Sequence, residues 1–203
     1  MPSITGATLI GKAKLIALDP ANIRWTDAEW LSFLNDGQKA LVVIKPRASV
    51  KVASQALVYG TKQTIPTDGI AFLEVTRNMG GNGTTPGLAP RPVERARLDA
   101  QMPTWNAATA TAVVTNYMGD PADPRIFRVY PPSDASAQVE VEYVALPAEL
   151  PTAASVISLE NVYGVPLIDY MLYRAYLKDI EFSGNAERAL FHLKQFESQL
   201  GKV

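Results

Sequence analysis

Hydrophobic residues recur at helical spacing near both ends of this chain and alternate with polar residues in its middle part. Near the N-terminus, apolar side chains fall on nearly all sides of residues 3–18, which predicts a helix buried on more than one side. Ser3 is placed to cap this helix, and the Asp19-Pro20 pair is expected to end it at about Leu18.

The second helix has the clearest start signal in the sequence. Thr26 and Glu29 have the spacing of a capping box, and Trp25 and Trp30 have the spacing of a hydrophobic staple. Because a proline disfavours helix both at its own position and at the residue before it, we expect this helix to end before Pro46.

Between residues 49 and 147 the pattern changes to short β-prone runs separated by Gly, Pro, Asn and Asp clusters. Strands are predicted over residues 52–59, 62–65, 70–77, 112–118, 126–130 and 137–145. The fifth strand is expected to stop at Pro131-Pro132, and the last shows strict alternation of apolar and polar residues. The Gly- and Pro-rich segment 78–92 is predicted to be irregular, and a short helix is expected near 96–101.

Helices return near the C-terminus, over about 167–181 and 186–200, with a break at Ser183-Gly184-Asn185. The first carries one apolar face made of Ile168, Met171, Leu172 and Ala175, and another made of Tyr170, Tyr173 and Leu177. The last helix has a single stripe made of Ala186, Ala189, Leu190, Leu193, Phe196 and Leu200. Phe191 falls outside that stripe, beside polar positions.

These elements predict an α+β fold. We expect the terminal helices, residues 1–48 and 150–203, to pack together as a discontinuous helical bundle. Residues 49–149 would then be an inserted β domain, because regular spacing of short strands favours a small antiparallel sandwich or barrel.

Composition narrows the function classes. The chain has 203 residues, of which 47% are hydrophobic, so a core can form without metals or disulfides. The net charge is −1, which indicates no overall attraction to nucleic acid or to a cationic partner. There is no cysteine, no basic leader followed by an apolar run, and no apolar stretch of membrane-spanning length, so we expect no disulfide, no signal peptide and no membrane association.

Signatures of catalysis are weak, and we expect the protein not to be an enzyme and to need no cofactor or metal. His192 is the sole histidine, and neither a zinc motif nor a nucleophile elbow accompanies it, so a solvated or interface position fits it better than a catalytic one. The glycines between 80 and 83 match neither phosphate-binding motif. Glu140 and Glu142 share a strand face and could imitate a glycosidase pair, although alternating glutamates are typical of any solvent-facing strand.

Two regions are candidates for protein contacts. The face with Tyr170, Tyr173 and Leu177 suits either core packing or a subunit interface, since tyrosine is enriched in both. Phe191 beside His192 and Arg188 on the last helix suits a docking surface. In the middle of the chain, the loop that includes Asn78, Gly80, Gly81 and Asn82 is a candidate contact loop, because long Gly- and Pro-rich loops often carry binding functions.

Three separated segments resemble the head–tail adaptor (connector) proteins of short-tailed bacteriophages. They are residues 24–49, with the capped Trp-Thr-Asp start; residues 125–132, RIFRVYPP, followed by the alternating VEVEY strand; and residues 167–196, with a helix, a Gly-Asn break and a helix. Residues 75–81 and 97–105 resemble the family in the expected order between them. The loop at 84–92 is longer than that pattern, and Gly37 replaces a helix-favouring residue. Glycine costs up to about 1 kcal/mol inside a helix, so it predicts close helix packing at that point.

The resemblance implies a structural virion protein, made in the bacterial host cytoplasm and located at the head–tail junction. Such a protein binds beneath the dodecameric portal protein as a ring of the same symmetry. It extends the channel through which viral DNA passes without sequence-specific binding, and serves retention and ejection of the genome. It also presents a surface to the tail nozzle protein.

In that setting the expected portal or subunit interface comprises Arg188, Phe191, His192, Tyr170, Tyr173 and Leu177. Asn78, Gly80, Gly81 and Asn82 would contact the tail or a neighbour. Two alternatives stay open: a tail-associated carbohydrate- or receptor-binding module that uses the loop 78–92, and a glycoside hydrolase that uses Glu140 and Glu142.

Overall fold

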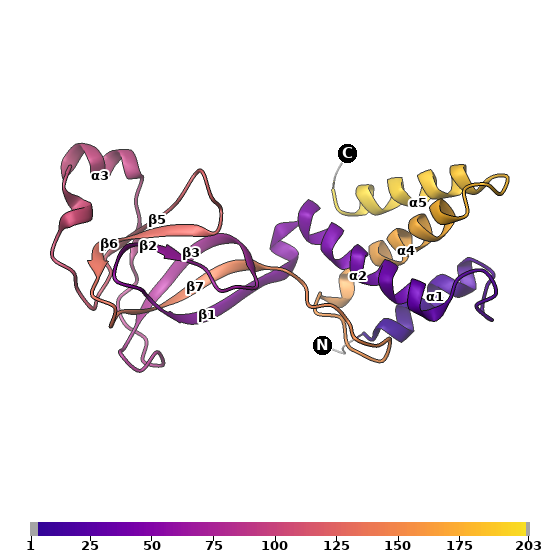
Figure 1. Cartoon of the computed structure of the whole chain (residues 1–203), viewed down its shortest axis with the longest axis horizontal. Coiled ribbons are helices and arrows are strands. Elements are labelled where there is room, and N and C mark those ends of the chain that lie inside the picture. The colour runs from indigo at the N-terminus through magenta and orange to yellow at the C-terminus, as the bar shows by residue number, and fades with distance from the viewer. Residues whose placement is uncertain (1–3, 202–203) are drawn as a thin grey trace. The chain divides into compact units, whose positions relative to one another are not determined.

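The computed structural model describes residues 4–201, and its fold is α+β, as predicted. The chain divides into two compact units (Figure 1). The sheet unit is Val50–Leu146, and the helical unit is formed by the segments of the chain that precede and follow it.

The helical unit is organised around one central helix. Its elements are α1 (Gly6–Ile16), α2 (Asp27–Ile44), the short 3-10 turns η1 (Pro46–Ser49) and η3 (Asn161–Tyr163), α4 (Gly164–Lys178) and α5 (Asn185–Gln199). Helix α4 packs against α1, α2 and α5. The predicted inner face of α4 is confirmed, because Ile168, Met171, Leu172 and Ala175 are all buried.

Helix α1 is shorter than predicted. Its N-cap is Thr5, whose side-chain oxygen accepts a hydrogen bond from the N–H of Thr8, whereas the expected cap Ser3 lies outside the described residues. The helix ends at Ile16, because the chain turns out of the helix after Ala17. The apolar residues on nearly all sides of this helix are not all buried, because Leu9, Ile10 and Ala13 are buried whereas Leu15 and Ile16 near its end are exposed.

The start of α2 confirms both local predictions. The N–H of Glu29 donates to the Thr26 hydroxyl at 3.3 Å, and the N–H of Thr26 donates to the Glu29 carboxylate at 2.9 Å, which is a complete capping box. The rings of Trp25 and Trp30, both fully buried, lie 5.5 Å apart at 69°. Gly37 also lies where α2 and α4 approach closely, since a β-carbon there would meet the Tyr170 ring.

The sheet unit contains two sheets among the described residues. Its elements are β1 (Val50–Ala56), β2 (Gly60–Thr64), β3 (Gly69–Met79), β4 (Arg91–Pro92), α3 (Arg95–Gln101), the turn η2 (Trp105–Ala107), β5 (Asn116–Gly119), β6 (Ile126–Ser133) and β7 (Gln138–Ala145). The strand orders are β1-β7-β3 and β2-β6-β5-β4. All pairs are antiparallel except β4 with β5.

Both sheets contribute side chains to one hydrophobic core, for example Val75 and Val141 from the first and Phe127 and Val129 from the second. The alternation predicted for the last strand is confirmed: Val139, Val141 and Tyr143 are buried, and the residues between them are not. Within the described residues the strands do not close into a barrel, so the barrel version of the prediction is not supported.

Several strand boundaries differ from the prediction. Strand β1 starts at Val50 and ends at Ala56, and β2 starts at Gly60. Strand β6 continues through Pro131-Pro132 to Ser133; a proline lacks an N–H but its carbonyl still accepts, and Pro132 O receives the N–H of Thr111 at 2.8 Å. Strand β5 begins only at Asn116, and β3 extends to Met79, into the segment predicted to be irregular. That segment also holds the short strand β4.

Candidate functional site

Three of the predicted contact residues meet on the helical unit, together with Tyr176 of α4. The ring of His192 stacks on that of Tyr176 at 5.8 Å and 15°, and Phe191 meets His192 edge-on at 5.3 Å. The Arg188 guanidinium lies 5.7 Å from the centre of the Tyr176 ring. We call Tyr176, Arg188, Phe191 and His192 the α5 cluster.

Of the two positions predicted for His192, solvated or interface, the structure does not show the solvated one. Its side chain is mostly covered, and Nδ1 lies 2.8 Å from the Asp169 carboxylate, one of whose oxygens also accepts a hydrogen bond from Gln199. His192 therefore ties α5 to α4, while Phe191 beside it stays 57% exposed. Sequence reasoning missed Tyr176 and Asp169, because their pairing with α5 follows from how two helices face each other.

Phe191 is the outer end of a continuous row of rings. In order, the row is Phe33, Trp30, Trp25, Tyr176, His192 and Phe191, with successive centroids 6.1, 5.5, 5.9, 5.8 and 5.3 Å apart. It passes through α2, α4 and α5, and aromatic pairs of this kind each contribute about 0.5–1.5 kcal/mol beyond their buried area. The exposed ring at the surface thus rests on a packed aromatic support.

The other predicted face, on α4, is mainly a packing element. The Tyr170 ring lies 5.1 Å from Phe196 of α5 and 5.7 Å from Tyr173, and its hydroxyl accepts a hydrogen bond from Arg174 at 3.3 Å. Arg174 in turn pairs with Asp36 of α2 at 2.9 Å. Tyr170 and Tyr173 are both partly buried, whereas Leu177 is exposed near the end of the helix.

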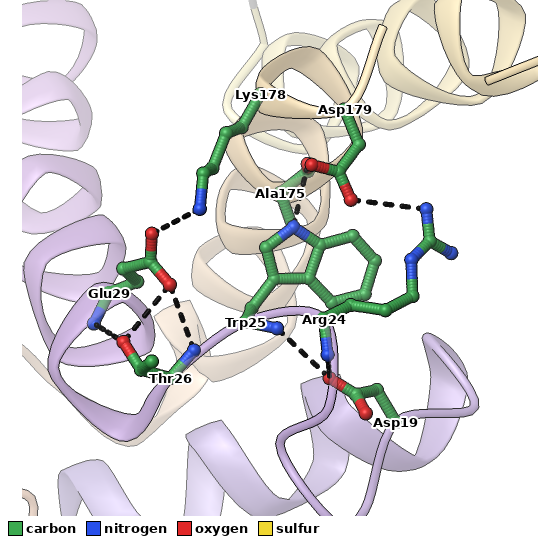
Figure 2. A network of polar contacts seen from close by, with 8 residues as sticks. All are labelled: Asp19, Arg24, Trp25, Thr26, Glu29, Ala175, Lys178 and Asp179. Atoms are coloured by element: carbon green, nitrogen blue, oxygen red, sulfur yellow. Dashed lines mark hydrogen bonds and ion pairs between the residues drawn. The ribbon is translucent and has the colours of Figure 1, made fainter. Parts of the chain in front are cut away.

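A polar network joins the start of α2 to the end of α4 (Figure 2). The Glu29 carboxylate, already in the capping box with Thr26, also forms an ion pair with Lys178. The hydrogen bond with Lys178, followed by that from the Thr26 N–H, outweighs partial burial and lowers the pKa of Glu29 from 4.5 to about 2. This carboxylate is therefore charged at neutral pH and links the two helices.

The same network fixes the loop between α1 and α2. Asp19 is buried, and its carboxylate accepts the N–H groups of Ile23, Arg24 and Trp25 at 2.7, 3.0 and 3.1 Å. Burial alone would raise the pKa of Asp19, but these donors and the Arg24 charge more than compensate and lower it.

Two further contacts join this loop to α4. The indole N–H of Trp25 donates to the Ala175 carbonyl at 3.1 Å, and Arg24 pairs with Asp179 at 3.2 Å.

In the sheet unit, the predicted contact loop surrounds a hollow of about 610 Å³. Asn78, Gly80 and Gly81 line it. Asn82 is outside its lining, and the side-chain Oδ1 of Asn82 accepts the N–H groups of Thr84 and Thr85. The hollow is also lined by Ala56, Met79, Thr85, Pro86, Gly87, Leu88, Ala112, Val113, Ala135, Ser136 and Gln138.

Asn78 is a buried structural residue at this hollow. Its amide nitrogen donates to the carbonyls of Leu88 and Val114 at 2.8 and 2.7 Å, and its amide oxygen accepts the N–H of Val114 at 2.8 Å. These bonds occupy the side chain within the fold, so Gly80 and Gly81 remain as the predicted residues of this loop that line the hollow.

The arrangement offers little to catalysis. The Glu140 carboxylate is occupied by Arg77 at 3.1 Å and by the Thr76 hydroxyl at 2.6 Å, and Glu142 lies between Val52 and Glu74 on the neighbouring strands. In the part of the chain that the structure describes, no three carboxylate or histidine side chains gather as metal ligands. Nor is any helix there long and apolar enough to cross a membrane.

Comparison with known proteins gives one result. No curated protein matches the sequence. A family model, that of the SU10 adaptor protein, matches residues 4–203, which takes in both the helical and the sheet unit. The match covers all the segments that resemble head–tail adaptors, so that resemblance is confirmed. The chain belongs to the SU10 adaptor protein family and is a structural adaptor protein of a phage virion.

Proposed function

We propose that this adaptor forms a ring beneath the portal protein, connects the phage head to the tail, and extends the DNA channel for retention and ejection of the genome. The observation that carries the proposal beyond family membership is the α5 cluster. It presents an exposed phenylalanine next to an arginine on a surface of the helical unit.

The α5 cluster has the composition of an interface hot spot. Aromatic residues and arginine are enriched where protein–protein binding energy is concentrated. Phe191 contacts the edge of His192, whose own ring is stacked on Tyr176, so part of the Phe191 ring is already supported before docking. This surface therefore suits contact with a large protein partner, for which we propose the portal.

A ring needs each subunit to offer two different surfaces to its neighbours. One such contact is supported by the face of α4 that carries Tyr170, Tyr173 and Leu177. Part of the Tyr170 ring is already packed against Phe196 of α5. The sheet unit supplies another surface. For this we propose the loop that contains Gly80 and Gly81, which line the hollow, and we propose that it contacts a neighbouring subunit or the tail nozzle protein.

The charge of the chain is compatible with a conduit for DNA. A net charge of −1 gives no strong general attraction for phosphate, whereas every phosphate contact made by a cation would add salt-dependent affinity and retain the genome. DNA would then pass through the ring without sequence-specific binding.

Native mass spectrometry of the protein mixed with the portal ring of the same phage tests the proposal. The expected result is a gain of one adaptor mass for each portal subunit. A portal ring that gains no mass, with both proteins shown to be folded by circular dichroism, would overturn it.

A second candidate is a tail-associated module that binds carbohydrate or a receptor. The hollow beside Gly80 and Gly81 favours it, since about 610 Å³ is within the range of small-molecule sites. Its lining residues include no aromatic ring on which a sugar could stack, so we place this candidate second. A glycan-array screen of the wild-type protein, repeated with residues 80–86 replaced by a Gly-Ser linker, separates the two.

A further inference from the structure

The hollow at the contact loop of the sheet unit has an uncharged lining. Within residues 4–201, the residues that line it include no aspartate, glutamate, lysine, arginine or histidine. The charged residues next in sequence to the lining are Arg77 and Asp134, and both have partners within the fold. Arg77 pairs with Glu140 at 3.1 Å, and the Asp134 carboxylate accepts the N–H and the hydroxyl of Ser136 at 2.8 and 2.7 Å. Because a charge buried without a partner is costly, the hollow favours an uncharged occupant.

The polar side chains on the lining are already engaged. Each has a hydrogen-bond partner within the described chain; they are Asn78, Thr85, Ser136 and Gln138. The rest of the lining is alanine, glycine, proline, methionine, leucine and valine. Small polar ligands are oriented by polar groups that converge on them. An occupant of this hollow would instead be held mainly by apolar contact.

Exposed apolar side chains continue the hollow onto the surface. Leu88 and Val113, which line it, are 75% and 46% exposed. Ala56, also on the lining, is followed by the turn between β1 and β2, where Val58 and Tyr59 are 62% and 75% exposed. We call Val58, Tyr59, Leu88 and Val113 the apolar rim. Because the apolar area extends from the hollow across this rim, a protein segment covers it better than a small molecule does.

The turn that carries half of the apolar rim is held in place by a buried amide. Oε1 of Gln63 accepts the N–H of Val58 at 2.9 Å, and Nε2 of Gln63 donates to the carbonyls of Val58 and Gly60 at 2.8 and 3.0 Å. The N–H of Leu57 donates to the carbonyl of Ala137, which lies between two lining residues, at 2.9 Å. The turn is therefore shaped and fixed beside the hollow before a partner binds, which lowers the ordering cost of binding.

The adjoining positions of turn and hollow indicate the kind of partner. Neighbours in a ring contact each other through two different surfaces of each subunit. Here the projecting turn and the hollow belong to one surface, since Ala56 lines the hollow and Val58 follows it closely in the turn. They are thus not placed to serve as the two complementary halves of a ring contact, and a single partner outside the ring would cover both.

We propose that the hollow and the apolar rim bind an apolar, uncharged segment of the tail nozzle protein. Side chains of that segment fill the hollow of about 610 Å³, and the apolar rim packs on the remainder. The inference deepens the proposed function and rests on it, because it names the surface and the chemistry through which the adaptor holds the tail.

The test measures binding of the purified tail nozzle protein of the same phage to the adaptor assembled on immobilised portal ring. Leu88→Lys places a charge at the hollow and should raise Kd by a factor of about 10 or more. A β-carbon on Gly81 meets nothing within 4 Å, so Gly81→Leu adds volume to the lining without displacing the fold and should also raise Kd.

Leu146→Lys is the matched control. Leu146 is 44% exposed and follows β7 at the end of that strand opposite to Gln138, which lines the hollow. This variant receives the same charge as Leu88→Lys, away from the hollow, and should change Kd by less than about twofold. Circular dichroism should show all three variants folded, because each substituted position is exposed or open.

A separate variant tests whether the bound segment is uncharged. Arg91 lines another hollow, of about 340 Å³, together with Leu88, and an acidic segment would pair with it. For an uncharged segment, Arg91→Gln should leave both Kd and its dependence on salt concentration as in the wild type. A weaker Kd together with a lost salt dependence in Arg91→Gln would identify an acidic segment and overturn the uncharged one.

The remaining outcomes are distinct. A portal ring that gains no adaptor would overturn the proposed function together with this inference. An adaptor ring that forms but binds no nozzle protein, or binds it equally well with Leu88→Lys and Gly81→Leu, would overturn the inference alone. Variants that fail to assemble on the portal would identify a neighbouring subunit as the occupant and overturn the nozzle segment. A glycan that binds the wild type but not Leu88→Lys would overturn the protein partner.

Discussion

Gly37 of α2 lies against the ring of Tyr170 in α4. A β-carbon placed on Gly37 would come within 3.0 Å of Cδ1 of Tyr170 and 3.4 Å of Cδ2 of Leu167, so the two helices approach as closely as glycine allows. One residue earlier, Asp36 pairs with Arg174, which also donates to the Tyr170 hydroxyl. The glycine that weakens α2 as an isolated helix therefore permits the contact that joins α2 to α4.

This contact predicts opposite effects for two helical glycines. Gly37→Ala should destabilise the protein by on the order of 1 kcal/mol, because Tyr173 and Phe196 leave the Tyr170 ring little room to move. Gly11→Ala in α1 is the control: a β-carbon there meets nothing within 4 Å, so it should stabilise by about 0.5–1 kcal/mol through helix propensity alone. Urea denaturation measures both. Equal gains would show that Gly37 is not a packing residue.

Glu29 predicts a pH dependence of stability. Its pKa is 4.5 when unperturbed and about 2 in the folded protein, so the folded state favours the charged form. The resulting stabilisation is fully present above pH 4.5 and is lost as the pH falls toward 2. Glu29→Gln removes it, so the difference in unfolding free energy between wild type and variant should be largest near neutral pH and should shrink between pH 4.5 and 2.

Denaturation curves at several pH values measure this difference. Glu187→Gln is the control, since that exposed carboxylate forms no ion pair among residues 4–201, and it should change the unfolding free energy by less than about 0.5 kcal/mol. A Glu29→Gln difference that does not change with pH would mean that the link to Lys178 contributes nothing through its charge.

Asn78 predicts a large effect within the sheet unit. Asn78→Ala leaves the N–H and carbonyl of Val114 without their side-chain partner and also removes one bond to Leu88. Buried groups left without hydrogen bonds cost about 1–3 kcal/mol each, so we expect a loss of about 2–4 kcal/mol. Asn82→Ala, at an exposed position in the same loop, should cost less than about 1 kcal/mol. Thermal melts followed by circular dichroism compare the two, and similar losses would contradict the structural role of Asn78.

The α5 cluster predicts a specific docking defect. Phe191→Asp should raise the Kd for the portal ring by a factor of about 10 or more, because hot-spot aromatic residues contribute above about 1–2 kcal/mol. Leu190→Asp is a closely matched control, since Leu190 is 58% exposed on the same turn of α5. Both variants should keep the wild-type circular dichroism spectrum. Equal binding by the two would remove the α5 cluster from the portal interface.

The structural features that the sequence predicted correctly are local ones. The capping box, the tryptophan staple and the alternation of β7 depend on neighbours a few residues apart, and the structure shows each of them. The close approach at Gly37 was also predictable, because a glycine inside a helix needs a reason. The start and end of α1 were less predictable from the sequence. At the start, Ser3 and Thr5 are both residue types that cap helices well, so the sequence does not decide between them.

The errors concern contacts between distant segments. Leu190 matched the helical stripe but is exposed, because the main helix contact of α5 is with α4, and that contact covers less of the α5 surface than the stripe suggested. The burial of Asn78 depends on Val114, 36 residues away, and that of His192 on Asp169, 23 residues away. Periodicity contains no information about such partners.

The discontinuous helical unit has a consequence for synthesis. Helices α1 and α2 leave the ribosome first, but α4, which packs on Trp25 through Tyr176 and the Ala175 carbonyl, follows only after the whole of Val50–Leu146 has been made. At bacterial translation rates that delay is on the order of 10 s. The sheet unit has all its strands in one continuous segment and can fold during this interval, while the apolar faces of α1 and α2 remain open to chaperones and to aggregation. The helical unit can therefore be completed only after the segment that follows Leu146 has been made. Slow translation before that stage, or the loss of a chaperone, would reduce the yield of assembly-competent subunits.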